Sequence, residues 1–169
     1  MRLPWTPVAG DLNKTMIKPL DAKKNDIVHG GASFPLGNRI FRLIWIITWA
    51  VLASWTPAPL HAWRRLVLRA FGAKIASTAR IYGSARIWYP PNLEMGEYSS
   101  MGWEVDCYCQ DKVTIDAYAT ISQFAHLVTG THYIDEPYFQ LYIRPIHIDR
   151  HAWVASGAFV GPGVTVGEG

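Results

Sequence analysis

The sequence predicts a mostly β protein folded as a parallel β-helix, and three observations support this. Large apolar side chains return at every sixth position over most of residues 75–169. The residue four places after each of them is usually small or β-branched, as at Ala79, Ala119 and Ala152. The count fails over one long stretch, between Leu127 and Ile148. A six-residue repeat is the signature of a parallel β-helix, in which three repeats close one triangular coil.

The repeat positions are occupied mainly by branched aliphatic residues and methionine. They are Ile75, Ile81, Ile87, Leu93, Met95, Met101, Cys107, Ile115, Ile121, Leu127, Ile148, Val154, Val160 and Val166. Two-residue slips precede Met95 and Ile115. Ordinary alternating strands would not confine the large residues to every third inward position. We therefore expect these side chains to stack inside a prism, with successive coils paired as parallel strands about 4.8 Å apart.

Residues 1–35 show no periodicity and mix Pro, Gly, Asn and Lys. This composition indicates an irregular N-terminal segment that can move as an arm. The segment lacks the apolar core and the small-residue cleavage site of a signal peptide. We therefore expect no secretory leader in it.

Residues 36–72 are expected to form two helices. The first contains Leu43–Trp55, thirteen residues without a charge, entered through Arg39 and Arg42. This is short for a membrane-spanning helix, which needs about twenty apolar residues. The second, His61–Phe71, carries an apolar stripe with its arginines off it. Basic residues beside Trp-rich apolar faces are typical of helices lying in a lipid headgroup layer. Packing on the end of the β-helix or on a neighbouring subunit would use the same faces.

Residues 73–169 hold all the repeats and are predicted to form the β-helix domain. The sequence stops at Gly169 inside a repeat, so we expect the complete protein to continue beyond it. Cys107 and Cys109 lie two apart on one strand and are poorly placed for a mutual disulfide, which predicts reduced thiols in a cytoplasmic protein. The net charge of +3 is too low for a nucleic-acid-binding domain, and no motif of that class is present.

The break in the repeat is the candidate site. Four histidines lie in or beside it: His126, His132, His147 and His151. His147 adjoins an inward aliphatic and should point outward, and His151 lies in a turn. His132 follows Gly130 and Thr131, where the chain leaves the coils. A neutral imidazole there could take a proton from a hydroxyl group, as histidine bases commonly do near neutral pH.

Several short motifs are specific in combination. Around the break they are Thr114-Ile-Asp, Leu127-Val-Thr-Gly-Thr-His132, Pro145-Ile-His-Ile-Asp149 and Ala152-Trp-Val-Ala-Ser156. Elsewhere they are Ser33-Phe-Pro-Leu-Gly-Asn-Arg39, Pro59-Leu-His-Ala-Trp-Arg-Arg65, Phe71-Gly-Ala-Lys-Ile75 and Val105-Asp-Cys-Tyr108. The first set resembles the maltose/galactoside O-acetyltransferases of the hexapeptide-repeat acyltransferase family. The second set more closely resembles the colanic acid biosynthesis acetyltransferases. The resemblance implies a left-handed β-helix and a homotrimer whose active sites are shared between subunits.

The resemblance also implies roles for particular residues. His132 matches the histidine that serves as catalytic base, although the family more often has Gly-Ser-His-Asp or Gly-His-Pro at this turn. Trp153 and Ser156 match a Trp-x-x-Ser motif whose serine lines the acetyl-CoA channel. Backbone N–H groups near Ser156 and Gly157 could stabilise an oxyanion. An exposed Trp153 at a trimer interface is an alternative.

Three further residues are candidates for contacts with the acceptor. Asp106 and Asp111 could bind its hydroxyl groups, or they could be solvated carboxylates at corners. Tyr133 could form part of a sugar platform, or it could pack the inserted loop against the coils.

The function implied is acetyl-CoA-dependent O-acetyl transfer to a sugar hydroxyl in exopolysaccharide biosynthesis, with no metal required. The acceptor would be a sugar or a lipid-linked oligosaccharide, reached by a cytoplasmic protein in peripheral contact with the inner face of the membrane. Two alternatives remain open. One is a zinc-dependent γ-carbonic anhydrase of the same fold, with histidine ligands across an interface. The other is a non-catalytic assembly platform at the membrane.

Overall fold

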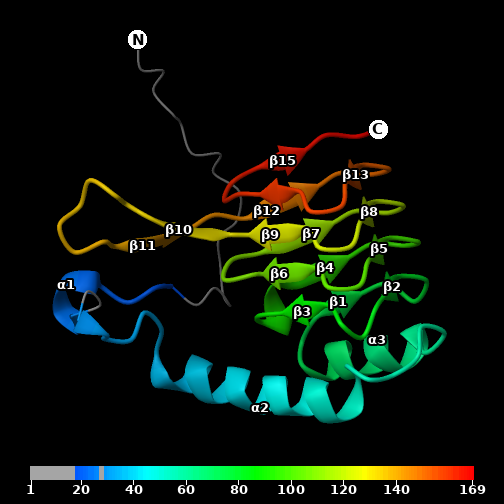
Figure 1. Ribbon diagram of the computed structural model, residues 1–169, viewed down its shortest axis with the longest axis horizontal. Helices are drawn as coiled ribbons and strands as arrows, with labels where there is room; N and C mark the ends of the chain where they lie inside the picture. Colours follow the sequence, from blue (N-terminus) through cyan, green and yellow to red (C-terminus); the bar gives the residue numbers. More distant parts are fainter. Residues whose placement is uncertain (1–17, 27–28) are drawn as a thin grey trace.

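The computed structural model describes residues 18–26 and 29–169 (Figure 1). Its helices there are α1 (Ala22–Asn25), α2 (Leu36–Leu52) and α3 (His61–Ala70), with a 3-10 turn at Pro90–Asn92. The described residues thus hold three helices rather than the expected two. Helix α1 is a single turn, begun by the Asp21 side chain and ended by Asp26 in the left-handed conformation. A helix of this length is too short to show an apolar periodicity, so the sequence pattern could not predict it.

Most strands belong to three parallel sheets that the chain visits in turn (Figure 1). The first sheet contains β1 (Lys74–Ile75), β4 (Leu93–Met95), β7 (Val113–Ile115), β12 (Ile146–Ile148) and β15 (Thr165–Val166). The second contains β2 (Arg80–Ile81), β5 (Ser100–Met101), β8 (Thr120–Ile121) and β13 (Trp153–Val154). The third contains β3 (Arg86–Ile87), β6 (Asp106–Tyr108), β9 (His126–Val128) and β14 (Phe159–Val160). Three consecutive strands, one from each sheet, make one coil.

The strand register confirms the six-residue repeat. Ile81 pairs with Met101 and Met101 with Ile121, so repeat positions meet directly across neighbouring coils. The slips before Met95 and Ile115 have a simple origin. The three-residue strands of the first sheet bury two residues each, as Leu93 and Met95 do in β4. Each slip therefore marks a longer strand and leaves the coil unbroken.

The core is the stack of inward side chains, together with the small residues at the corners. The repeat positions from Ile75 to Val160 are all buried. Cys107 and Cys109 are buried free thiols, as predicted. In the outermost strand, Val166 is only partly buried and Val164 before it is exposed.

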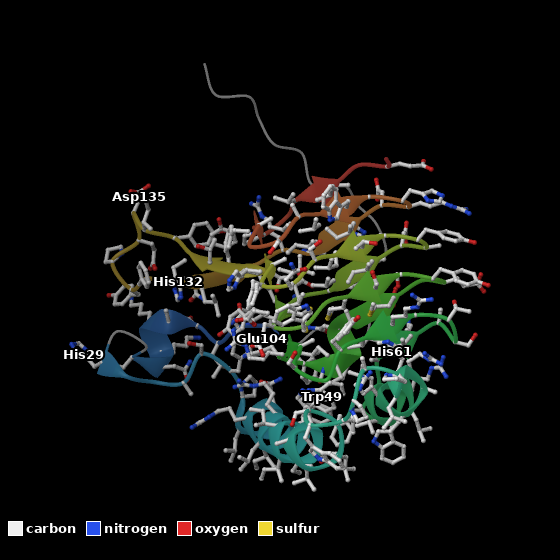
Figure 2. All side chains as sticks on the ribbon, turned by 45° about the vertical axis from the view of Figure 1, so that its right-hand side comes forward. His29, Trp49, His61, Glu104, His132 and Asp135 are labelled. Carbon is white, nitrogen blue, oxygen red and sulfur yellow. The ribbon has the colours of Figure 1, made fainter. Side chains whose placement is uncertain are left out.

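Helices α2 and α3 lie across the edge formed by β1, β2 and β3 (Figure 1). The indole of Trp45 donates to the carbonyl of Ile87 at 2.6 Å, and that of Trp49 to the carbonyl of Gly83 at 3.1 Å. Trp49 points from α2 toward the strands (Figure 2). These indole N–H groups give hydrogen-bond partners to carbonyl groups of the first coil. Without the helices, that coil would be an open sheet edge. No helix within residues 18–26 and 29–169 is long and apolar enough to cross a membrane.

Candidate functional site

The break in the repeat is an excursion loop, residues 129–145, that leaves the coils after β9. Its base is an antiparallel pair of strands, β10 (Gly130–His132) and β11 (Leu141–Ile143), in which His132 lies opposite Leu141. The loop projects away from the stacked sheets (Figure 1). It returns at Arg144, whose N–H donates to the carbonyl of Thr129 at 2.8 Å. The excursion therefore interrupts the coil at one corner and leaves the pairing of β7 with β12 intact.

The ring of His132 is held by one residue of the loop. Its Nδ1 lies 2.7 Å from the carbonyl oxygen of Phe139, and the two rings stack with centroids 4.2 Å apart and planes 11° apart. A carbonyl oxygen can only accept, so Nδ1 must carry the proton. In the neutral imidazole, the lone pair then lies on Nε2. This is the arrangement that a general base needs.

The excursion loop is bound to the N-terminal segment through Gln140. The N–H of Ala22 donates to Gln140 Oε1 at 2.7 Å, and Gln140 Nε2 donates to the carbonyl of Leu20 at 3.1 Å. The N–H of Gln140 donates to Glu136 within the loop. Residues 18–26 are thus attached to the loop and differ from the mobile arm that their composition predicted. Residues 1–17 lie outside the described residues. The contact joins positions almost 120 apart, and no local pattern encodes it.

A groove of about 460 Å³ opens beside His132. We call it the basic groove. It is lined by Gly30, Gly31, Ala32, Ser33, Phe34, Arg39, Arg42, Trp88, Tyr108, Gln110, Gly130, His132 and Leu141. The groove therefore brings together the segment before α2, the start of α2, the third sheet and the excursion loop.

Arg42 forms one wall of the basic groove. Its guanidinium stacks over the ring of Trp88 at 4.2 Å, and its Nε donates to Asn38 Oδ1 at 2.9 Å. Burial lowers the pKa of Arg42, the Tyr108 phenol partly offsets this, and the nearby charge of Arg39 lowers it further. The ring of Trp88 also meets that of Tyr108 edge-on at 5.5 Å. The wall therefore combines a desolvated cation with two aromatic rings.

The absence of a side chain at Gly130 makes room for a neighbour in the groove. A Cβ at this position would collide with Oε1 of Gln110. That oxygen is buried and has no hydrogen-bond partner among the described residues. Any side chain at position 130 would therefore displace Gln110 or the strand that carries His132.

The predicted acceptor residues lie away from the basic groove. Asp106 on β6 has Oδ2 3.2 Å from Nη2 of Arg86 and 4.0 Å from Nδ1 of His126. Asp111 is buried, and its Oδ1 accepts from the N–H of Lys112 at 2.7 Å. Burial raises the pKa of Asp111, and this hydrogen bond opposes the rise.

Tyr133 lines a second hollow on the excursion loop, of about 630 Å³, that also includes His132. Its side chain is exposed, and its ring centroid lies 4.4 Å from that of Tyr142. Of the three predicted acceptor residues, Tyr133 alone shares a hollow with His132 in the described part of the chain.

The predicted acetyl-CoA residues follow β13 at another corner. The indole of Trp153 donates to Ser122 Oγ at 2.8 Å, and Ser156 Oγ donates to the carbonyl of Gln123 at 3.0 Å. The N–H of Gly157 donates to the same carbonyl at 3.2 Å. None of Trp153, Ser156 and Gly157 lines a described hollow that contains His132.

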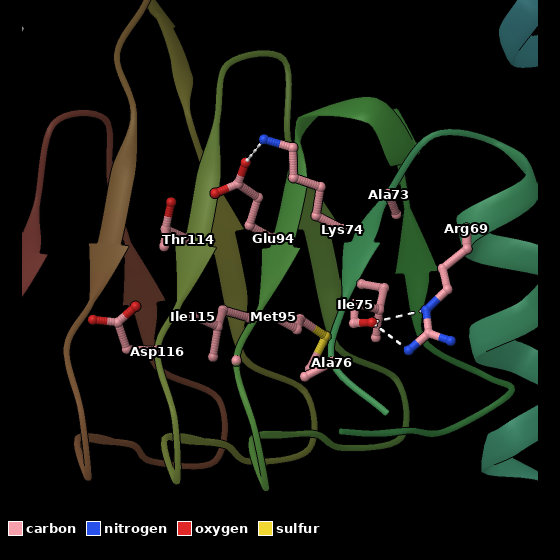
Figure 3. Close-up of a pocket in the computed structure, with 11 residues that line it drawn as sticks. Arg69, Ala73, Lys74, Ile75, Ala76, Glu94, Met95, Thr114, Ile115 and Asp116 are labelled. Carbon is pink, nitrogen blue, oxygen red and sulfur yellow. Dashed lines mark hydrogen bonds and ion pairs between the residues drawn. The ribbon is translucent and has the colours of Figure 1, made fainter. Parts of the chain in front are cut away.

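A further hollow, of about 500 Å³, lies over the outer face of the first sheet (Figure 3). Glu94 lies in it between Lys74 at 2.7 Å and Lys112 at 2.8 Å. Burial alone would raise the pKa of Glu94, but the two ammonium groups outweigh it and lower that pKa. The lining of this hollow contains no histidine, and both carboxylate oxygens of Glu94 are engaged by ammonium groups.

Sequence reasoning missed most of the basic groove. The sequence presents Arg39 and Arg42 as the charged entrance to a helix, and it presents Arg39 and Tyr108 as members of family motifs. No sequence pattern singles out Trp88 or Gln110. One signal was present, since residues 27–93 contain eight Lys or Arg and no Asp or Glu. In the described ranges, no group of three or more His, Cys, Asp or Glu is arranged to hold a metal ion.

Comparison with known proteins agrees with the fold. No protein-family model matches the chain. The protein named "Putative colanic acid biosynthesis acetyltransferase WcaF" of Escherichia coli strain K12 is 39% identical over 133 residues, covering 79% of this chain and 73% of that protein.

Two solved structures share the fold at low identity. A maltose O-acetyltransferase from Clostridium difficile 630 is similar with a TM-score of 0.66 at 17% identity, covering 78% of this chain and 71% of that one. A galactoside acetyltransferase in complex with coenzyme A is similar with a TM-score of 0.68 at 18% identity, covering 90% of this chain and 75% of that one. The curated relative carries the assignment, and these structures support the fold. The chain belongs to the hexapeptide-repeat acetyltransferase family, with the colanic acid biosynthesis acetyltransferases.

Proposed function

We propose that the protein is an acetyl-CoA-dependent O-acetyltransferase that acts on a sugar hydroxyl in exopolysaccharide biosynthesis, with His132 as the general base. The observation that carries the proposal is the hydrogen bond from His132 Nδ1 to the Phe139 carbonyl, which leaves Nε2 as the basic atom. The names of the relatives support acetyl transfer, and the coenzyme A bound to the galactoside acetyltransferase supports the co-substrate.

In this mechanism, Nε2 of His132 removes the proton of an acceptor hydroxyl as its oxygen attacks the thioester carbonyl. A C–O bond forms, the C–S bond breaks, and the imidazolium returns the proton to the leaving thiolate of coenzyme A. The tetrahedral intermediate needs a hydrogen-bond donor at its oxyanion. The N–H of Gly157 already donates to Gln123, so the backbone N–H of Ser156 is the better candidate. The chain uses no metal in this scheme.

The active protein is proposed to be a homotrimer of left-handed β-helices. The supporting observation is that, within one chain, Trp153 and Ser156 line no described hollow that contains His132. A threefold assembly would let the excursion loop of one subunit meet the Trp153 corner of the next. Residues 73–169 would be the transferase unit. Light scattering should give three times the chain mass of 19.0 kDa, and a monomer that is fully active would contradict the assembly.

The direct test of the base is His132→Ala. Loss of a general base typically lowers kcat by 10²–10⁴-fold, so release of coenzyme A in the presence of a sugar acceptor should fall by about that factor. His147→Ala is the matched control, because His147 lies exposed on β12. Both variants should retain the mass of the assembly. A His132→Ala protein with unchanged turnover would place the base elsewhere.

We also propose that residues 36–72 hold the protein on an anionic membrane surface. Helix α2, the connection after it and α3 expose many large apolar side chains. They are Leu36, Ile40, Leu43, Ile44, Ile46, Ile47, Val51, Leu52, Trp55, Leu60, Trp63 and Leu66. An apolar helical face with basic residues around it is suited to the boundary between headgroups and acyl chains. The absence of any Asp or Glu from residues 27–93 favours anionic lipid as the occupant. A lipid-linked acceptor would lie at the same surface.

Point substitutions test the membrane contact better than deletion, because α2 and α3 also cover the first coil. Ile44→Glu with Ile47→Glu should move the protein from the pellet to the supernatant when it is sedimented with anionic phospholipid vesicles. Ile134→Glu is the control, since Ile134 is an exposed isoleucine on the excursion loop. If the Ile44 and Ile47 variant still sediments with vesicles, this face does not make the contact.

A further inference from the structure

We infer that the basic groove binds a negatively charged sugar, whose carboxylate or phosphate group is held by Arg39 and Arg42 beside His132. The inference rests on the proposed function, because it names the class of acceptor that the His132 site would take. A sugar carboxylate and a sugar phosphate both place an anionic group on a pyranose ring. The experiment below distinguishes these two kinds of acceptor.

The charge of the groove is unbalanced. Its lining contains two arginines and a histidine but no aspartate or glutamate. Neither Arg39 nor Arg42 forms an ion pair with a carboxylate among residues 18–26 and 29–169. Arg39 is exposed, but Arg42 is partly buried, and a buried cation is normally paired with an anion. No carboxylate of residues 18–26 and 29–169 therefore supplies the counter-charge that the partly buried Arg42 would take.

The positive charges of the two guanidinium groups repel each other. Arg42 is partly buried between Trp88 and Asn38, and both this burial and the nearby charge of Arg39 disfavour its charged form. A single bound anion would relieve both the desolvation and the repulsion. Guanidinium groups also match the oxygens of carboxylate and phosphate, to which they can donate two parallel hydrogen bonds.

The remaining walls suit a sugar ring. Trp88 and Tyr108 present aromatic rings, and Tyr108 adds a hydroxyl that can donate and accept. Gln110 is only 4% exposed, and its Oε1 has no partner among the described residues. A few polar groups placed among aromatic side chains are typical of small-molecule sites.

The position of His132 links this site to the chemistry. His132 lines the same groove as Arg39 and Arg42, so an anion held by the arginines would fix which hydroxyl of the ring faces Nε2. Orienting a reactant in this way can supply a large part of a rate enhancement. Arg39 and Arg42 are thus assigned as residues that determine acceptor specificity.

The test uses the full chain and three probes: glucose 1-phosphate, glucuronate and glucose. Binding is measured by calorimetry, and acetyl transfer from acetyl-CoA is measured separately. At least one anionic probe should bind at least tenfold more tightly than glucose, and added sodium chloride should weaken it. Preference for glucose 1-phosphate identifies a sugar phosphate, and preference for glucuronate identifies a sugar carboxylate. Equal binding of all three probes would overturn the inference.

Variants assign the effect to the groove. Arg39→Gln and Arg42→Gln should each weaken the anionic probe about tenfold or more and leave glucose unchanged. Arg42→Lys keeps the charge but loses the paired guanidinium hydrogen bonds and the stacking on Trp88. It should therefore weaken binding of the anionic probe less than Arg42→Gln does. Arg80→Gln removes the same charge from an exposed strand position outside the groove, and it should have no effect.

The two proposals fail in different ways. If anionic probes bind selectively and the arginine variants abolish this selectivity, the inference holds even without acetyl transfer, and only the proposed function fails. If acetyl transfer occurs but Arg39→Gln and Arg42→Gln affect glucose and anionic acceptors equally, the enzyme is supported and the anionic acceptor is wrong.

Discussion

His132 obtains its orientation from a backbone carbonyl, which no side-chain substitution can remove. The stacked ring of Phe139 is the part of this arrangement that can be changed. Catalytic histidines are commonly fixed by a partner at the nitrogen that does not react. Here the partner belongs to the same loop, so the reactivity of the proposed base depends on how well the loop is ordered.

Phe139→Ala tests this dependence. The hydrogen bond from His132 to the residue 139 carbonyl can persist, but the ring loses its packing, so kcat should fall about tenfold with little change in KM. Steady-state kinetics measure the split. Tyr138→Ala, at an exposed neighbouring position, is the control. A pure KM effect would mean that Phe139 contacts the acceptor instead.

Asp111 makes a second prediction, for stability. Burial raises its pKa in the folded protein, so between its ordinary pKa and the raised value the folded state binds more protons than the unfolded state. The free energy of unfolding must then decrease as the pH rises through this window. Asp111→Asn should remove this decrease and stabilise the protein at neutral pH. Urea unfolding at a series of pH values measures it, with the exposed Asp116→Asn as control. A variant less stable at neutral pH would contradict the account.

At the scale of elements, one buried arginine joins the helices to the coils. Arg64 on α3 is fully buried, and it donates to the carbonyls of Ile81, Thr56 and Pro57 and to the hydroxyl of Thr56. Burial lowers the pKa of this guanidinium, and the Tyr82 phenol partly offsets the effect. A charge is held here by carbonyl dipoles of the connection between α2 and α3.

Arg64→Leu should therefore destabilise the protein by about 3 kcal/mol, because several buried carbonyls lose their donors at once. Arg64→Lys should recover little, since an ammonium group cannot reproduce the forked geometry. Chemical denaturation measures both. Stability within about 0.5 kcal/mol of the wild type would show that water replaces the lost donors.

Gln140 is the corresponding link between the N-terminal segment and the excursion loop. Gln140→Ala removes its hydrogen bonds to Ala22 and Leu20, so hydrogen exchange at residues 20–22 and in the loop should accelerate, and kcat should fall with it. Gln140→Glu keeps the acceptor for the Ala22 N–H and loses the donor to the Leu20 carbonyl. Its rate of hydrogen exchange should therefore lie between those of the wild type and of Gln140→Ala. Unchanged exchange in Gln140→Ala would mean that other contacts hold the segment.

On the scale of the whole molecule, charge is segregated along the chain. Residues 27–93 contain eight basic residues and no acidic residue, whereas the rest of the chain contains eight basic and thirteen acidic residues. Helix α2 carries both proposed surfaces, because Arg39 and Arg42 line the groove while Ile44 and Ile47 belong to the exposed apolar set. A sugar acceptor attached to a membrane lipid would therefore approach the groove from the end of the molecule that we propose rests on lipid.

The repeat made much of the fold predictable. A large apolar residue at every sixth position reports one inward direction per strand, and the pairing of Ile81, Met101 and Ile121 follows from it. His132 could be located because it lies at the point where that count stops. Arg39 and Trp88 could not be connected with it, because they belong to separate elements and share no period.

The sequence by itself thus determined the coils, their core and the position of the inserted loop, since each depends on local spacing that repeats. Tertiary structure alone decided which nitrogen of His132 carries the proton, how Gln140 ties the N-terminal segment to the loop, and that two arginines of α2 share a groove with the histidine. These features depend on contacts between distant segments, whose geometry is fixed only when the coils stack and the helices cover their edge.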